Sequence, residues 1–257
     1  MKSWKERYRL ESKPLSSGGQ AEVFEARERE KGMVVALKRI TSRDNLSIPR
    51  MRREIEVQRK VKHNNVMPIL DYSEDFSWYT MPLADQVLGK LTPPLDTETI
   101  FRIVEECAQG LAAAHAMGFI HRDLTPKNIL RLRVGEDTAW VVSDWGLVRR
   151  HGMTTVVKTL PGTQFGTYGF AAPELWENAH TATERADVYS LGRVVAWCTT
   201  GKEPAHNIEL IPDGDWSDFV YWTTLSNRDD RASNMAEVFE LLKSIKINKG
   251  TVYSFNI

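Results

Sequence analysis

The sequence predicts an α+β protein of two lobes, in which a small strand-rich lobe with one helix precedes a larger, mainly helical lobe. Two observations carry this prediction. Short β-like runs fill most of the chain up to Pro82, and apolar residues at helical spacing dominate after Ala84. The 257 residues, 42% of them hydrophobic, suffice for a large core. We therefore expect residues 1–82 and residues 83–257 to form the two lobes of one domain.

The expected small lobe consists of strands around a single helix. Residues 6–40 alternate in β-like runs that break at residues 16–19, as in a hairpin. Residues 50–62 place apolar side chains among charges, which predicts an amphipathic helix with a solvated basic face. Residues 66–70 and 78–81 are expected to form two further strands.

The expected large lobe opens with a long helix over residues 97–117. Asp96 or Thr97 can cap its first turn, and Gly118 can close its end. The remaining elements expected in this lobe are a hairpin over residues 129–142 and helices over residues 184–199 and 235–245.

Composition excludes several classes of protein. Lys plus Arg and Asp plus Glu both number 34, so the formal net charge is zero, which argues against nucleic-acid or anionic-membrane partners. Cys107 and Cys198 lie in apolar helical patterns, as small core residues in a reducing compartment do. No apolar run approaches the roughly 18 residues of a membrane span, and the N-terminus lacks the apolar region of a signal peptide. We expect a cytoplasmic protein.

The stretch from His121 to Asn128 carries the strongest chemical signal. Asp123 followed five residues later by Asn128 supplies a carboxylate and an amide, and Asp144 follows two apolar residues and a serine. Apolar residues flank both pieces, so a buried framework can present these polar groups at the rim of a cleft. Oxygen ligands of this kind suit a hard cation. The two pieces indicate a phosphoryl-transfer site.

Other signals occur in a fixed order around this stretch. Residues 35–38 form an apolar run ending in Lys38, Glu54 lies in the predicted helix, and residues 166–174 and Arg231 follow downstream. This order resembles the eukaryotic-type protein kinase family from about residue 15 to about residue 242. The resemblance implies a bilobal protein-kinase-like fold, one catalytic domain, ATP and Mg²⁺ as cofactors, and a protein substrate.

The resemblance also implies catalytic roles for individual residues. Asp123 would accept or orient the proton of the attacking hydroxyl, and Asn128 and Asp144 would hold Mg²⁺. Lys38 would contact the α- and β-phosphates, and Glu54 would pair with Lys38 to hold it there.

Residues 16–23 lie where the family has its Gly-rich loop, with Ser16 in place of the first glycine and Ala21 in place of the third. Gly18 and Gly19 still allow backbone amides to approach phosphate closely. Pro82 has no amide hydrogen, so the hinge donor would be Ala84. The implied nucleotide-binding residues are Ser16, Gly18, Gly19, Val23, Ala36, Lys38, Met81 as gatekeeper, Ala84, Leu130 and Asp144.

The chain departs from the family at two places. Thr125 stands where Ser/Thr kinases carry a lysine, and Lys127 is expected to take over that role, while Pro126 favours Ser/Thr acceptors. Gln58 stands among the apolar spine residues that link the lobes, beside Ile69, His121 and Trp145. Because burying an amide without partners costs about 1–3 kcal/mol, the helix that carries Gln58 is expected to sit outward.

The resemblance predicts three further features of the large lobe. Glu174 is expected to form a buried pair with Arg231. Asp187 is expected to bind the backbone of the catalytic loop, which is the stretch from His121 to Asn128. Arg122 is expected to bind a phosphate on the activation segment, which runs from Asp144 to Glu174. The candidate phosphorylation sites are Thr154 and Thr155, ahead of Thr159 and Thr163.

The sequence thus predicts an ATP- and Mg²⁺-dependent kinase that phosphorylates protein Ser/Thr hydroxyls and itself. One alternative is a pseudokinase that binds nucleotide and acts as a scaffold. Another is a small-molecule kinase, which predicts no ordered pair between Glu174 and Arg231.

Overall fold

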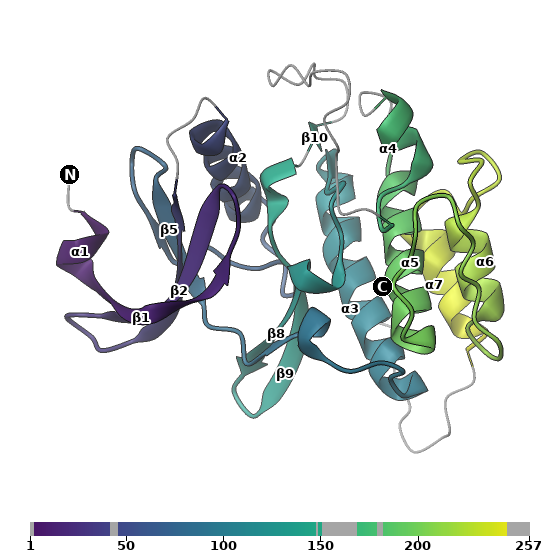
Figure 1. Cartoon of the computed structure of the whole chain (residues 1–257), viewed down its shortest axis with the longest axis horizontal. Helices are drawn as coiled ribbons and strands as arrows, with labels where there is room; N and C mark the ends of the chain where they lie inside the picture. Colours follow the sequence, from purple (N-terminus) through teal and green to yellow (C-terminus); the bar gives the residue numbers. More distant parts are fainter. Residues whose placement is uncertain (1–2, 42–45, 148, 151–168, 179–181, 246–257) are drawn as a thin grey trace.

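The computed structural model describes residues 3–41, 46–147, 149–150, 169–178 and 182–245, and it has two lobes side by side (Figure 1). The small lobe comprises α1 (Trp4–Arg7), β1 (Tyr8–Ser17), β2 (Ala21–Glu28), β3 (Val34–Ile40), α2 (Ser47–Lys60), β4 (Asp71–Tyr72) and β5 (Trp78–Pro82). Its five strands form one antiparallel sheet in the order β1-β2-β3-β5-β4. The two-lobed α+β fold predicted from the sequence is confirmed, whereas the boundary at residue 82 stays a prediction.

Strand β3 separates two small cores because its side chains alternate between the faces of the sheet. Val35 and Leu37 pack in a cluster with Tyr8 and Trp78 on one face. Ala36 belongs to the other cluster, which includes buried residues of α2. Lys38 shares the face of Ala36, so the same alternation that builds the sheet turns this lysine towards α2.

Helix α2 begins at Ser47, three residues before the predicted start. Met51 and Ile55 are buried, whereas Arg52, Arg59 and Lys60 are exposed, which agrees with the predicted solvated basic face.

The strand predicted over residues 66–70 is wrong. Val66 makes an isolated bridge to Val142, and the edge strand β4 comes only afterwards. Met67 accounts for the difference, because its amide donates to the carbonyl of Val142 and its carbonyl accepts from Gln58. Pro68 has no amide hydrogen to offer a neighbouring strand. The backbone of Met67 therefore bonds outside the sheet, and this stretch reaches the sheet at Leu70, whose amide donates to the carbonyl of Thr80 at 2.8 Å.

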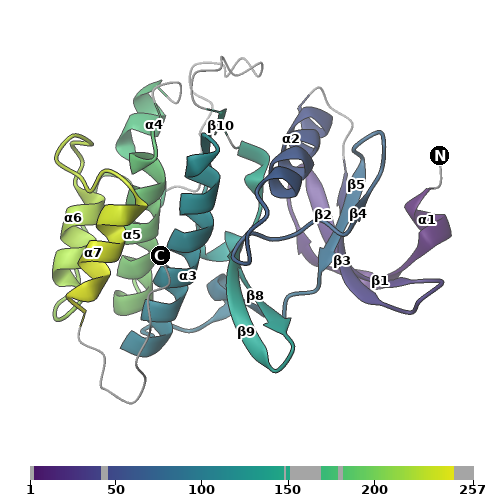
Figure 2. The same ribbon diagram turned by 180° about the vertical axis from the view of Figure 1, so that it is seen from behind.

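The large lobe is built on helices α3 and α5 (Figure 2). The bounds of its helices are α3 (Thr97–Ala116), α4 (Pro173–Asn178), α5 (Arg185–Thr200), α6 (Ser217–Thr224) and α7 (Met235–Lys243); α4 and α6 were not predicted. Asp96 caps α3 by accepting from the amide of Thr99 at 2.8 Å, and Gly118 follows the helix with φ at +75°. Cys107 and Cys198 are buried free thiols in the main core. No helix in the described ranges is long and apolar enough to cross a membrane.

The predicted hairpin lies between the lobes and positions the polar loops. Its strands β8 (Ile129–Val134) and β9 (Asp137–Val142) pair in register from Ile129 opposite Val142 to Val134 opposite Asp137. The short elements around it are β6 (Gln86–Val87), η1 (Leu88–Lys90), β7 (Phe119–Ile120), η2 (Pro126–Asn128), η3 (Trp145–Leu147) and β10 (Arg149–Arg150). Because η2 leads directly into β8 and η3 follows shortly after β9, the two polar motifs of the sequence meet at one end of the hairpin.

Candidate active site

A cavity of about 910 Å³ lies where the two lobes meet. Every residue that the sequence predicted as catalytic or nucleotide-binding lines this cavity: Ser16, Gly18, Gly19, Val23, Ala36, Lys38, Glu54, Met81, Ala84, Asp123, Lys127, Asn128, Leu130 and Asp144. The structure thus brings together groups from six separate stretches of the chain. Their chemical roles stay predictions.

Lys38 stands between two carboxylates. Its Nζ donates to both oxygens of Glu54 at 2.8 and 2.9 Å, and to Oδ1 of Asp144 at 3.2 Å. The side chains of Lys38 and Glu54 are 12% and 3% exposed, whereas that of Asp144 is 45% exposed. Helix α2 therefore holds Glu54 on Lys38, and Asp144 presents its carboxylate to the cavity.

One ammonium facing two carboxylates sets the protonation of this cluster. Burial would lower the pKa of Lys38, but Asp144 and Glu54 raise it, so the lysine keeps its proton. Burial raises the pKa of Glu54 to about 7, against the opposing effects of Lys38 and the Tyr79 hydroxyl. Desolvation would raise the pKa of Asp144, but the charge of Lys38 outweighs it and the pKa is lowered. Asp144 is therefore ionised at neutral pH.

The catalytic loop is held from below by Asp187 on α5. Its carboxylate, fully buried, accepts from the backbone amides of His121 and Arg122, each at 2.8 Å, and lies 2.7 Å from Nε2 of His115. Arg122 adopts a left-handed conformation with φ at +67°, a strained geometry for a side chain other than glycine. The predicted contact of Asp187 with the loop backbone is confirmed. These bonds hold the chain in the turn that aims Asp123 at the cavity.

Asn128 and Asp144 fit a Mg²⁺ ion. The Nδ2 of Asn128 donates to the carbonyl of Asp123 at 2.8 Å, which leaves the amide oxygen of Asn128 as its ligand atom. Ser143 donates through its amide and its hydroxyl to the carbonyl of Asn128, so the two motifs are locked together. Mg²⁺ is commonly held by few protein oxygens together with substrate phosphates and water. Within the described ranges, no three His, Cys, Asp or Glu side chains gather into a metal site made by protein alone.

The predicted Gly-rich loop and the predicted hinge, residues 82–84, both line the cavity. The amide of Gly18 donates to the carbonyl of Ala21 at 3.0 Å, which shapes the turn between β1 and β2. Asp85, beyond the hinge, already donates its amide to the carbonyl of Arg131. Since Pro82 has no amide hydrogen, Ala84 remains the predicted hinge donor.

The expectation that Gln58 would push α2 outward is wrong. Gln58 is buried, and its Nε2 donates to the carbonyl of Met67 at 2.8 Å. Its Oε1 is buried without a hydrogen-bond partner among the described residues. His121 and Trp145 meet edge to face with ring centroids 4.6 Å apart, and Trp145 is fully buried. The hydrogen bond of the Gln58 Nε2 offsets part of the cost of burying the amide, and α2 lies against the cleft with Glu54 bound to Lys38.

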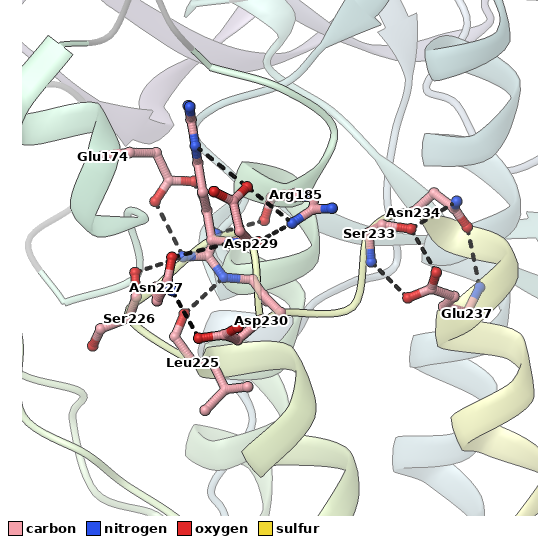
Figure 3. Close-up of polar contacts among 12 residues, drawn as sticks. Glu174, Arg185, Leu225, Ser226, Asn227, Asp229, Asp230, Ser233, Asn234 and Glu237 are labelled. Carbon is pink, nitrogen blue, oxygen red and sulfur yellow. Dashed lines mark hydrogen bonds and ion pairs between the residues drawn. The ribbon is translucent and has the colours of Figure 1, made fainter.

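Glu174 and Arg231 form the predicted buried pair. Figure 3 labels Glu174 together with Arg185, Leu225 and Ser226, which also bind Arg231. The guanidinium of Arg231 donates to both carboxylate oxygens of Glu174, at 2.8 and 3.1 Å. It also donates to backbone carbonyls of Leu225, Arg185 and Ser226. The pair is confirmed, and it contradicts the small-molecule kinase alternative. The threonines at 154, 155, 159 and 163 lie outside the described residues.

The sequence did not single out two residues that complete the site. Tyr79 on β5 donates its hydroxyl to Oε1 of Glu54 at 2.7 Å, and His115 on α3 binds Asp187. Tyr79 could have been found by alternation, because it lies two residues before Met81 on the same face of β5. His115 is the second-to-last residue of α3 and carries no local sequence signal for its contact.

The contacts of Glu174 and Asp187 are those expected of enzymes that act on proteins, so the fold and the site together define a protein kinase domain. The chain belongs to the protein kinase domain family, which it matches over residues 10–243. Members of this family generally use ATP and Mg²⁺.

Several bacterial relatives share the match. The chain is 37% identical over 204 residues to the serine/threonine-protein kinase PknH of Mycobacterium bovis, covering 74% of this chain and 32% of the relative. It is 37% identical over 208 residues to PknD of Mycobacterium tuberculosis, covering 77% and 30%, and 35% identical over 217 residues to PknE of the same species, covering 79% and 36%. The chain spans about a third of the length of these curated relatives.

Proposed function

We propose that this chain is an active protein kinase that transfers the γ-phosphate of ATP to a Ser or Thr hydroxyl of a protein, including its own. The observation that carries the proposal is the position of Lys38 in hydrogen-bond contact with Glu54 and Asp144 at once. A phosphoryl group carries its charge on three oxygens, so catalysis depends mainly on positioning and electrostatic stabilisation. The cluster of Lys38, Glu54 and Asp144 can supply both the positioning and the electrostatic stabilisation.

In the proposed reaction, the acceptor oxygen forms a bond to the γ-phosphorus while the bond from that phosphorus to the β,γ-bridging oxygen breaks. Asp123 takes the proton that the acceptor hydroxyl loses, and ADP leaves with the bridging oxygen. Mg²⁺, when bound, neutralises charge on the phosphates. Asn128 and Asp144 hold the ion, and Lys38 orients the α- and β-phosphates.

Lys127 takes the place of the lysine that is absent at Thr125. Lys127 lines the cavity within η2, one residue before Asn128, whereas Thr125 is buried. A cation at this position can face the γ-phosphate during transfer. The relatives named as serine/threonine-protein kinases support Ser/Thr as the acceptor class.

The pseudokinase alternative rests on Thr125, Gln58 and the substituted Gly-rich loop. Substitution of Asp123 by Asn separates the two functions, because it removes the proton acceptor and keeps the size of the side chain. We expect Asp123→Asn to bind ATP nearly as tightly as the parent while its turnover falls about 10²–10⁴-fold. Binding is measured by calorimetry and turnover by transfer of labelled phosphate. Equal turnover of the parent and Asp123→Asn would show that Asp123 is not the proton acceptor.

A further inference from the structure

Tyr79 reaches from the sheet to the helix that carries Glu54. In the sheet, Tyr79 is the register partner of Lys38, so the two side chains project from neighbouring strands towards α2. The Tyr79 hydroxyl donates to Oε1 of Glu54 at 2.7 Å, the same oxygen that accepts from Lys38 at 2.8 Å. Tyr79 is 1% exposed, so water cannot readily replace this donor.

The Tyr79 hydroxyl stays protonated at neutral pH. Burial raises the pKa of Tyr79 well above its usual value, with Glu54 and Asp144 adding to the effect, so the phenol stays protonated and donates. Lys38 also lies 5.9 Å from the centroid of the Tyr79 ring. A phenylalanine would keep this ring contact and lose only the hydrogen bond.

We propose that the Tyr79 hydroxyl is a positioning group that holds the Glu54 carboxylate against Lys38 and thereby sets how tightly the cleft binds the nucleotide phosphates. Lys38 is shared between Glu54 and Asp144. Among the described residues, Lys38 and Tyr79 are the side chains that donate to Glu54. Without the Tyr79 hydroxyl, Glu54 would keep the ammonium of Lys38 as its side-chain donor there. The inference rests on the proposed function only in taking Lys38 as the phosphate contact.

The chain offers a matched control in Tyr8. Tyr8 is also buried in the small-lobe sheet, at 3% exposed, and its hydroxyl donates to the carboxylate of Asp71 at 3.0 Å. It packs with Trp78 in the cluster on the face of the sheet away from Ala36 and does not line the cavity. Tyr8→Phe therefore removes a tyrosine–carboxylate hydrogen bond of the same sheet, this one partly buried, without touching the cleft.

The test compares the affinities of MgADP and adenosine, which share the base and ribose and differ in the phosphates. Calorimetry with Tyr79→Phe should show MgADP binding weakened about 10-fold, with adenosine binding unchanged. Tyr8→Phe should bind both ligands as the parent does. An unchanged MgADP affinity in Tyr79→Phe, or an equal loss for both ligands, would overturn the inference. Because binding requires no turnover, the result is independent of whether the parent transfers phosphate.

Discussion

Two buried ion pairs of this molecule differ in what surrounds the cation. Arg231 is fully buried, and besides both oxygens of Glu174 it donates to three backbone carbonyls. Lys38 donates to three acceptors that are all carboxylate oxygens, one of them on the exposed Asp144. Backbone acceptors are fixed by the fold, whereas side chains can rearrange. We therefore expect the first pair to be structural, and the second to exchange partners if a phosphate binds as we propose.

The largest stability effect should follow truncation of Arg231. Arg231→Ala leaves the Glu174 carboxylate and three carbonyls without their donor, which should lower the free energy of unfolding by about 3–5 kcal/mol. Urea unfolding measures the loss. The matched control is Lys243→Ala, because Lys243 is exposed and pairs with the exposed Glu240, a kind of pair worth about 0–1 kcal/mol. Equal losses in the two variants would show that the Glu174 pair contributes no more than a surface contact.

The smaller effect concerns Glu54 and depends on pH. The pKa of Glu54 is raised from 4.5 to about 7 in the folded protein, so folding takes up a proton between these values. The stabilisation from that proton is greatest below pH 4.5 and is lost as the pH rises towards 7. Unfolding of the parent and Glu54→Gln at pH 5.5 and 7.5 tests this directly. The stability of the parent relative to the variant should be greater at pH 5.5; a difference that is constant or reversed would contradict the raised pKa.

Local sequence patterns predicted most of the elements. The family resemblance implied the catalytic and nucleotide-binding residues that line the cavity, whereas Tyr79, which also lines it, was missed. Lys38, Asp123 and Asp144 were found because each lies beside a strand or loop whose apolar pattern is strong. Non-local pairing caused the errors. The stretch after Val66 resembles a strand in composition, yet its Met67 bonds to the hairpin of the large lobe and to Gln58.

The same limitation explains the misjudged glutamine and the overlooked tyrosine. Whether Gln58 is satisfied depends on the carbonyl of Met67, nine residues away in a segment without regular structure. The role of Tyr79 depends on the register between β3 and β5, which pairs it with Lys38, and on how α2 is placed along these strands, which brings Glu54 to its hydroxyl. Neither quantity is encoded in the residues immediately around these positions.

Phosphoamino-acid analysis tests the central claim most directly. The purified chain is incubated with γ-labelled ATP, Mg²⁺ and a protein acceptor, beside an Asp144→Ala variant that lacks the exposed carboxylate of the Lys38 cluster. The account predicts labelled phosphoserine or phosphothreonine with the parent, and a loss of about 10²-fold or more with the variant. A parent that binds MgATP and leaves all protein unlabelled would contradict the account and favour a nucleotide-binding scaffold.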